Sequence, residues 1–308
     1  MTHTVVAPEF GGPEVLTVID EQVPPPGPGR VQVEVRAAGV NPADYKMYNG
    51  AFGTDPRSLP VRPGIEVSGV VVAVGDDGPF RVGDEVIAYT GTGGYTERLN
   101  VAATDVLAKP AALPWEQAAG LLTTGGTAVD ALTTTAVTAG DTVLIHGASG
   151  GVGSLAVQLA VARGATVIGT ARASNHSYLR ELGAVPVEYG DGLADRLRAA
   201  APDGFDAAVD TVGTDEAVDA SLELVADRGR IVTIAAFGRA EQDGFPAIGG
   251  GTPESARIRR EARAGLVDLA GQGKLVVQVA KTFPLADAAR AHTELAAPHP
   301  RGKFVLLP

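Results

Sequence analysis

Cysteine is absent from the 308 residues of the chain. The protein therefore has no disulfides, no thiolate nucleophile and no sulfur ligands for zinc or an iron–sulfur cluster. The sequence also lacks any run of about 18 apolar residues, which a membrane-spanning helix needs. Its first residues, Met1–Thr4, have neither the basic nor the apolar region of a signal peptide. We expect a cytoplasmic protein that does not act in a membrane.

Positive charge is scarce. The chain has 25 lysine and arginine residues against 36 aspartate and glutamate residues, a formal net charge of −11 at pH 7. This balance disfavours nucleic-acid binding by phosphate neutralisation, although one local basic patch can still hold one anionic ligand. The histidines show no metal-ligand spacing such as H-x₃-H, so no metal site is expected. They are His3, His146, His176, His292 and His299.

Length and composition indicate two domains of a globular enzyme. The chain exceeds what one hydrophobic core usually serves, and it is 45% hydrophobic and 20% charged. Residues 31–36 alternate between apolar and polar side chains, as a half-buried strand does, and residues 67–74 form a longer apolar strand. The first hundred or so residues therefore predict an all-β, barrel-like domain.

The pattern changes near Pro114, after which apolar strands alternate with helices. Such alternation predicts a parallel sheet covered on both faces. The expected strands are 142–145, 166–169, 205–210 and 230–235, and the expected helices are 151–163, 174–182, 191–200, 215–226 and 253–271. Strands at 275–279 and 303–307 are expected to rejoin the first domain. The predicted domains are 1–114 with 272–308, and 115–271.

A glycine cluster follows the first of these strands. Gly147-Ala-Ser-Gly-Gly-Val-Gly153 stands between a strand and a helix, the context of a dinucleotide-binding turn. Without a Cβ, Gly150 and Gly151 let a pyrophosphate approach the backbone, and Gly153 lets the helix pack close to the strand. The helix start supplies free N–H groups for the phosphates. We expect Ser149, Gly150, Gly151 and Val152 to contact a dinucleotide; a ligand-free turn is the alternative.

The tip of the second strand indicates which dinucleotide binds. NAD sites usually place an acid there to hold the ribose 2′-hydroxyl, but this strand ends in Ala171-Arg-Ala-Ser-Asn-His176. Arg172 can hold a 2′-phosphate with two hydrogen bonds, and Asn175 adds a polar donor beside it. The sequence therefore favours NADP(H) as the cofactor, with a solvated surface role as the alternative for Arg172.

These motifs together resemble the zinc-free medium-chain dehydrogenases/reductases of the quinone oxidoreductase, or zeta-crystallin-like, group. The resemblance implies an α/β protein in which a GroES-like β-barrel catalytic domain joins a Rossmann doubly wound parallel-sheet domain, with the active site between the two. Zinc-dependent relatives carry Gly-His-Glu, whereas this chain reads Gly64-Ile65-Glu66. The matching segments are 38–46, 62–71, 82–86, 94–97, 145–153, 210–213 and 301–303.

The resemblance also implies catalytic residues in the segment after Asn41-Pro42. Lys46 stands where some plant-type enone reductases of this group carry an active-site lysine, and Tyr45 is an alternative hydrogen-bond donor. Asn41 is a third polar candidate. Three other interpretations stay open: a surface lysine for Lys46, core packing for Tyr45, and a turn residue before proline for Asn41.

Further cofactor contacts follow from the resemblance by position. Thr127 matches a segment near the nicotinamide ribose, with a buried helical threonine as its alternative. The ends of the fourth and fifth Rossmann strands and a C-terminal lysine are the other positions. They are Thr211, Val212, Ala236, Phe237 and Lys303, with a surface role as the alternative for Lys303. The glycine-rich segment 238–252 is expected to be a loop, either a cover over the substrate or an ordinary connection.

Together these observations predict an NADPH-dependent reductase of a quinone or an enone that works without a metal. Hydride goes to the acceptor, and hydrogen-bond donors stabilise the negative charge that develops on its oxygen. One alternative is an enoyl-thioester reductase of acyl or polyketide-like intermediates. Another is a non-catalytic NADPH-binding structural or regulatory protein, because lens crystallins use this fold. The expected partners are a small carbonyl or quinone substrate and, by the resemblance, a second copy in a homodimer.

Overall fold

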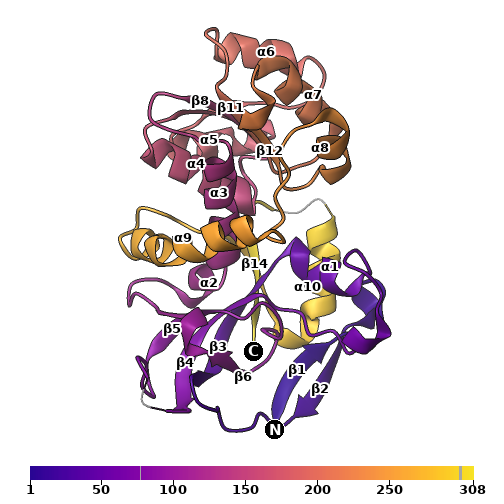
Figure 1. Cartoon of the computed structure of the whole chain (residues 1–308), viewed down its shortest axis with the longest axis vertical. Coiled ribbons are helices and arrows are strands. Elements are labelled where there is room, and N and C mark those ends of the chain that lie inside the picture. The colour runs from indigo at the N-terminus through magenta and orange to yellow at the C-terminus, as the bar shows by residue number, and fades with distance from the viewer. Residues whose placement is uncertain (77, 298–299) are drawn as a thin grey trace. The chain divides into compact units, whose positions relative to one another are not determined.

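The computed structural model describes residues 1–76, 78–297 and 300–308, so His299 lies outside the described residues. The chain forms two compact units (Figure 1). Unit 1 comprises Met1–Thr123 and Val267–Pro308, and unit 2 comprises Thr124–Leu266. The domain boundaries expected from the sequence, after residues 114 and 271, stay a prediction that limited proteolysis would test. None of the helices in the described part of the chain combines the length and hydrophobicity that a bilayer crossing requires.

Unit 1 is built on a seven-stranded sheet in which most neighbours are antiparallel. The strand order is β13-β14-β3-β4-β5-β7, with β6 paired to β3 and with β13 parallel to β14. A separate antiparallel pair is formed by β1 and β2. The strands are β1 (Thr2–Val6), β2 (Thr17–Glu21), β3 (Arg30–Val40), β4 (Glu66–Val74), β5 (Glu85–Tyr89), β6 (Arg98–Ala102), β7 (Val106–Ala108), β13 (Val279–Pro284) and β14 (Lys303–Leu307).

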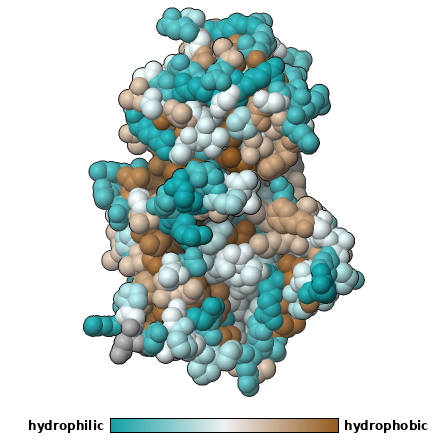
Figure 2. Space-filling model, in the orientation of Figure 1, coloured by the Kyte–Doolittle hydropathy of each residue, from teal (hydrophilic) through white to brown (hydrophobic). Residues whose placement is uncertain are grey.

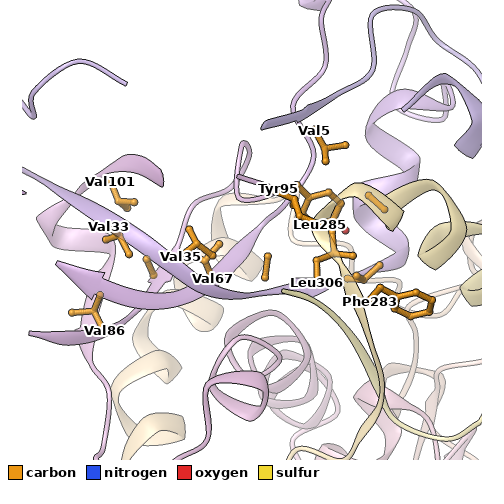
Figure 3. Packing of buried hydrophobic residues seen from close by; sticks show 14 of the residues in the cluster. Val5, Val33, Val35, Val67, Val86, Tyr95, Val101, Phe283, Leu285 and Leu306 are labelled. Carbon is orange, nitrogen blue, oxygen red and sulfur yellow. The ribbon is translucent and has the colours of Figure 1, made fainter. Parts of the chain in front are cut away.

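The core of unit 1 is a cluster of buried valines completed by larger side chains from the C-terminal segment. Alternate residues of a strand face the same side of a sheet, so the alternation in β3 directs its valines to this cluster, and Val67 and Val71 of β4 join them. In Figure 3, Val33 and Val86 lie at one end of this cluster, Tyr95, Leu285 and Leu306 lie at the other, and Val35 and Val67 lie between them. Residues from both ends of the chain therefore build one core.

The expected strand at 275–279 is wrong in its position, because β13 begins only at Val279. The preceding residues instead close the long helix α9 (Pro253–Gly271). Gly273 adopts a φ of +69°, and the N–H groups of Lys274 and Leu275 donate to the carbonyl of Leu269. The helix therefore ends through a glycine in the left-handed region, and Leu275, which the apolar pattern assigns to a strand, belongs to this helix end.

Unit 2 is a parallel five-stranded sheet with the order β10-β9-β8-β11-β12. This is the doubly wound order, and the chain reverses direction across the sheet between β8 and β11. The expected Rossmann architecture is confirmed. The strands are β8 (Thr142–His146), β9 (Thr166–Thr170), β10 (Val185–Val187), β11 (Ala207–Asp210) and β12 (Ile231–Thr233).

Helices cover both faces of the unit 2 sheet. Ile168 lies in a buried cluster with residues of α6, α7 and α8, whereas a Cβ added to its neighbour Gly169 would meet Leu179 of α5 at 3.3 Å. The outer surface over α6 and α7 is mostly hydrophilic (Figure 2). The remaining helices are α1 (Pro42–Tyr48), α2 (Trp115–Ala118), α3 (Leu122–Thr134), α4 (Gly151–Ala162), α5 (His176–Glu181), α6 (Leu193–Ala200), α7 (Asp215–Leu224), α8 (Phe237–Asp243) and α10 (Ala288–Ala296).

The segment 238–252 is not a loop throughout, contrary to the expectation from its glycines. Helix α8 occupies its first part and ends at Gly244, whose φ is +74°. The chain then returns beside β12, where the Thr233 N–H donates to the carbonyl of Pro246 and the Ile248 N–H donates to the carbonyl of Thr233. Only residues 249–252 remain as a glycine-rich connection into α9.

Candidate functional site

The glycine turn of unit 2 leaves the start of α4 free of side chains. Gly150 is the N-cap of this helix, and no described side chain caps it. A Cβ added to Gly151 would find its nearest neighbour, the Cγ2 of Thr124, at an ordinary 3.5 Å. The first N–H groups of a helix have no intrahelical acceptor, and the helix dipole favours an anion there. The turn therefore has the room and the donors that a pyrophosphate needs.

Gly147 and Gly153 have a different role from Gly150 and Gly151. A Cβ on Gly153 would lie 2.2 Å from the carbonyl oxygen of Gly147 and 2.9 Å from the Cα of Ala148, distances that no packing tolerates. Gly147 adopts a φ of +69°, the left-handed region that favours glycine. These two glycines shape the turn, whereas Gly150 and Gly151 leave its outer surface open.

Two predicted cofactor residues meet at this turn. The side-chain amide of Asn175 donates to the Oγ of Ser149 at 3.0 Å, which ties the tip of β9 to the turn after β8. Val152 lies partly buried in the first turn of α4. Predicted contacts from two strand ends therefore form one continuous edge.

Arg172 is exposed at the tip of β9, as a 2′-phosphate ligand should be. Its Nε donates to the hydroxyl of Tyr189 at 3.1 Å, and the neighbouring Ala173 N–H donates to the carboxylate of Glu188 at 3.2 Å. Sequence reasoning missed both partners. The available signal is that they directly follow the strand β10, whose residue Val187 pairs in parallel with Thr170 of β9.

The ends of β11 and β12 form the other half of this edge. Thr211 donates its hydroxyl to the carbonyl of His146 at 2.7 Å. Val212 and Phe237 are 47% and 44% exposed at these strand ends. Ala236, by contrast, is buried, and its N–H donates to the hydroxyl of Thr233 at 2.9 Å.

A buried polar row that sequence reasoning missed lies under these strand ends. Asp210 accepts hydrogen bonds from the N–H groups of Val212 and Gly213, both at 2.9 Å, and from the hydroxyl of Thr233 at 2.6 Å. His146 occupies the paired position on β8, with its Nδ1 3.3 Å from the hydroxyl of Thr170. The row holds the loops of four strands in register.

His146 makes the stability of unit 2 sensitive to acid. Burial lowers its pKa from 6.5 to about 4, although Asp210 opposes this shift. Between these pH values the unfolded chain binds a proton that the native protein does not, so stability falls as the pH falls through this window. When the pH is lowered from 7 to 5, the unfolding free energy of wild type should fall by about 2 kcal/mol more than that of His146→Gln. Urea unfolding at both pH values checks this, and parallel curves would contradict it.

Thr127 lies inside α3, where it is buried. The same helix begins beside the glycine turn, because Thr124 is the nearest neighbour of a Cβ added to Gly151. One turn beyond Thr127, the carboxylate of Asp130 accepts from the Nε of Arg259 at 2.8 Å and binds the hydroxyl of Ser255. The position of Thr127 agrees with the alternative of a buried helical threonine, and a contact between Thr127 and the cofactor stays a prediction.

A buried cation–carboxylate cluster occupies the interior of unit 1. The Nζ of Lys303 lies 3.1 Å from the Oε1 of Glu66 and also donates to the Oδ1 of Asn41. Glu66 accepts from the side-chain amide of Asn41 at 3.3 Å and from the N–H of Thr123 at 2.9 Å. The structure thus joins the predicted catalytic residue Asn41 to the predicted cofactor residue Lys303. It places Lys303 in unit 1, whereas the other predicted cofactor residues belong to unit 2.

Tyr45 and Lys46 lie partly buried on the short helix α1. Asn41 is the N-cap of this helix, and its N–H donates to the carboxylate of Asp44 at 2.8 Å; Pro42 fills the first helical position. The ring of Tyr45 packs edge-on against that of Tyr48 at 5.4 Å between centroids. This ring contact agrees with the core-packing interpretation of Tyr45, and a chemical role for Tyr45 stays a prediction.

No metal-binding group is found in unit 1 or unit 2 as far as their residues are described. Ile65, at the position where a histidine would be a ligand in zinc-dependent relatives, is buried. Its apolar side chain has no lone pair to offer a metal. Glu66, next along β4, instead has the ammonium of Lys303 as its partner.

Two family models match the chain. One, described as an alcohol dehydrogenase GroES-like domain, covers residues 27–111, and the other, described as a zinc-binding dehydrogenase, covers residues 182–306. Their match supports the GroES-like and Rossmann assignments of the two parts. The second description refers to zinc, but the sequence here offers neither the histidine nor the cysteine ligand that zinc-dependent relatives carry.

The chain is also similar over its whole length to named relatives. It is 36% identical to a quinone oxidoreductase of Pseudomonas aeruginosa, over 97% of both chains. The solved Escherichia coli quinone oxidoreductase complexed with NADPH superposes with a TM-score of 0.85 at 29% identity, over 100% of both chains. A solved NAD-dependent alcohol dehydrogenase reaches a TM-score of 0.87 at 29% identity, over 99% of both chains, so the fold alone does not select the cofactor. By sequence and fold together, the chain belongs to the quinone oxidoreductase group of the medium-chain dehydrogenases/reductases.

Proposed function

We propose that this protein is an NADPH-dependent quinone oxidoreductase that uses no metal. The observation that carries the proposal is the start of α4, where Gly150 and Gly151 leave helix N–H groups open beside the cation of Arg172. Bound NADPH would supply the hydride. The chain's own residues would bind the phosphates, orient the acceptor and donate hydrogen bonds to its oxygen. Relatives named as quinone oxidoreductases over the full length of the chain support the choice of acceptor.

Arg172 is proposed to select NADPH over NADH. Its guanidinium is exposed, and its Nε is fixed by the hydroxyl of Tyr189. Its outer nitrogens have no partner among the described residues and can bind a 2′-phosphate. We expect Arg172→Ala to lower kcat/KM for NADPH about tenfold to a hundredfold and to leave the value for NADH within about twofold. Initial rates with both cofactors and 1,4-benzoquinone measure this.

The matched control is Arg180→Ala, which removes an exposed arginine from α5 in the same unit. It should keep the wild-type preference for NADPH. An equal loss of NADPH and NADH activity in Arg172→Ala, or no loss in either, would show that this residue does not read the 2′-phosphate.

Tyr45 and Lys46 are the proposed hydrogen-bond donors to the acceptor oxygen. Both lie on α1 and are partly buried, whereas Asn41 already uses both ends of its side-chain amide within the protein. We therefore assign Asn41 to positioning rather than to direct donation. Full activity in both Tyr45→Phe and Lys46→Ala would remove these residues from the donor role.

The comparisons do not favour the two alternatives, and one assay separates them. An enoyl-thioester reductase would oxidise NADPH faster with crotonyl-CoA than with 1,4-benzoquinone or a short enone. A non-catalytic protein would be thermally stabilised by NADPH yet oxidise none with any acceptor. The proposed function predicts the fastest turnover with the quinone.

We also propose a homodimer in the cytoplasm, as the family resemblance implies. The unit 2 sheet ends in β10 on one side and β12 on the other, and two such sheets could pair at an edge. Sedimentation velocity tests the assembly, and a single species at the mass of one 31.3 kDa chain would contradict it.

A further inference from the structure

Four buried side chains in unit 1 form one continuous hydrogen-bonded chain. The carboxylate of Asp44 lies 3.1 Å from the hydroxyl of Tyr95, and this hydroxyl lies 2.9 Å from the Nε2 of His292. The Nδ1 of His292 lies 2.7 Å from the hydroxyl of Tyr48. All four residues are at most 3% exposed. They come from α1, the segment before β6, and α10, so the chain fastens three separate elements together.

The charge on Asp44 dictates which way every hydrogen points. An ionised carboxylate can only accept, and Asp44 then accepts from the N–H groups of Asn41 and Gly64 and from Tyr95. Because the Tyr95 hydroxyl donates its hydrogen to Asp44, its oxygen can only accept from His292. His292 must therefore carry its proton on Nε2. The bare Nδ1 then accepts from Tyr48. No other arrangement satisfies all the bonds of a neutral imidazole.

Protonation of Asp44 reverses this order. The new carboxyl hydrogen is donated to the Tyr95 oxygen, and the Tyr95 hydroxyl donates to the Nε2 of His292. The imidazole proton then resides on Nδ1 and is donated to the oxygen of Tyr48. The hydrogens balance if each passes one bond along the chain: Tyr95 gives its hydrogen to Asp44, the Nε2 hydrogen of His292 passes to Tyr95, and the hydroxyl hydrogen of Tyr48 passes to Nδ1. One proton taken up from solvent restores the Tyr48 hydroxyl, whose hydrogen no longer points at the imidazole. The net gain is the single proton on Asp44.

We propose that His292 is a positioning residue whose tautomer follows the charge of Asp44, and that this chain holds α1, with Tyr45 and Lys46, against α10. The reversal acts beside Tyr45, whose ring packs on Tyr48 and lies 6.5 Å from the His292 ring. It therefore changes the polarity of the hydroxyl next to the proposed donor. This functional part rests on the proposed function, whereas the tautomer itself does not.

The surroundings allow Asp44 to be the group that titrates. Burial raises the pKa of Asp44 to about 6, while the nearby Lys303 and its hydrogen bonds oppose the shift. Burial lowers the pKa of His292 to about 4, so the ring stays neutral where Asp44 changes charge. Burial also raises the pKa of Tyr48 and Tyr95, which keeps both protonated. The other ionisable groups that act on this chain are Glu14, Tyr45 and Glu66.

The direct test reads the tautomer of His292 by two-bond ¹⁵N–¹H correlation spectra of histidine-labelled protein, with its signals assigned from their loss in His292→Gln. We expect the Nε2–H form at about pH 8 and the Nδ1–H form, still neutral, at about pH 5. In Tyr95→Phe the link to Asp44 is cut, so the tautomer should no longer change with pH. The same tautomer at both pH values in the wild type, or an imidazolium at pH 5, would overturn the proposal.

The second test follows kcat/KM for 1,4-benzoquinone between about pH 5 and pH 8. The wild type should change at least about threefold with an inflection near pH 6, and Tyr95→Phe should lack that inflection. Thr293→Ala, an exposed substitution on α10, should retain it. An inflection that persists in Tyr95→Phe refutes the positioning role. Absence of turnover with every acceptor instead refutes the proposed function and leaves the tautomer result standing.

Discussion

Lys303→Met is expected to remove about 3–5 kcal/mol of unfolding free energy. The substitution keeps an unbranched apolar stem of similar length but takes the ammonium away from Glu66, which is fully buried. A buried carboxylate without its cation retains its desolvation cost and loses its compensation. Asn41 also loses the donor to its side-chain oxygen. Urea unfolding at pH 7 measures the loss.

The double variant distinguishes this cause from simple repacking. Glu66→Gln removes the charge and keeps an acceptor for the N–H of Thr123. In the Lys303→Met background it should restore about 2 kcal/mol, since no charge is then left unpaired. Additive losses in the double variant would mean that the two residues do not depend on each other. The same double variant tests the prediction that Lys303 contacts the cofactor. Unchanged NADPH affinity in the double variant would contradict that prediction.

Gly151→Ala is expected to separate cofactor binding from stability. A Cβ there meets only Thr124 at 3.5 Å, and alanine in the first turn of a helix is favoured over glycine. The variant should therefore be as stable as wild type or more stable by up to about 1 kcal/mol. It should nevertheless bind NADPH about tenfold to a hundredfold more weakly, because the methyl group covers the N–H groups that face the pyrophosphate. Thermal unfolding and NADPH fluorescence titration give the two values.

Two other glycines provide the controls. Gly153→Ala places a Cβ 2.2 Å from a backbone oxygen and should cost about 3 kcal/mol or more. Gly265→Ala lies in α9, where an added Cβ meets nothing within 4 Å, and should gain stability without any change in NADPH affinity. Wild-type NADPH affinity in Gly151→Ala would refute the proposed phosphate site.

The parts of the fold that could be predicted are those carried by local patterns. The apolar run and glycines around residues 142–153 specify strand, turn and helix within one short segment, and the structure follows them. The alternation of β3 is equally local. The local pattern gave the wrong prediction for the segment 238–252. Its glycines suggested a loop, whereas α8 forms there because its residue Ala240 is buried in the cluster against the sheet. That contact is invisible in the segment itself.

The candidate site shows the same division. The glycine turn and Arg172 could be found by spacing along the chain. The partner of Lys303 could not, because Asn41 lies 262 residues away in sequence. Likewise, Tyr48 and His292 are 244 residues apart and meet only because α1 and α10 pack together. Residue types and spacing identify ligand-binding turns, whereas buried polar partners depend on tertiary contacts.

Strand β14 has a consequence for synthesis. It lies between β13 and β3 in the interior of the seven-stranded sheet, yet it follows all of unit 2 in the chain. During translation, the edge of β3 that pairs with β14 therefore stays without its partner until the whole of unit 2 has left the ribosome. In ribosome-stalled chains that are long enough to expose all of unit 2 but end before residue 303, unit 2 should therefore resist protease while unit 1 stays susceptible.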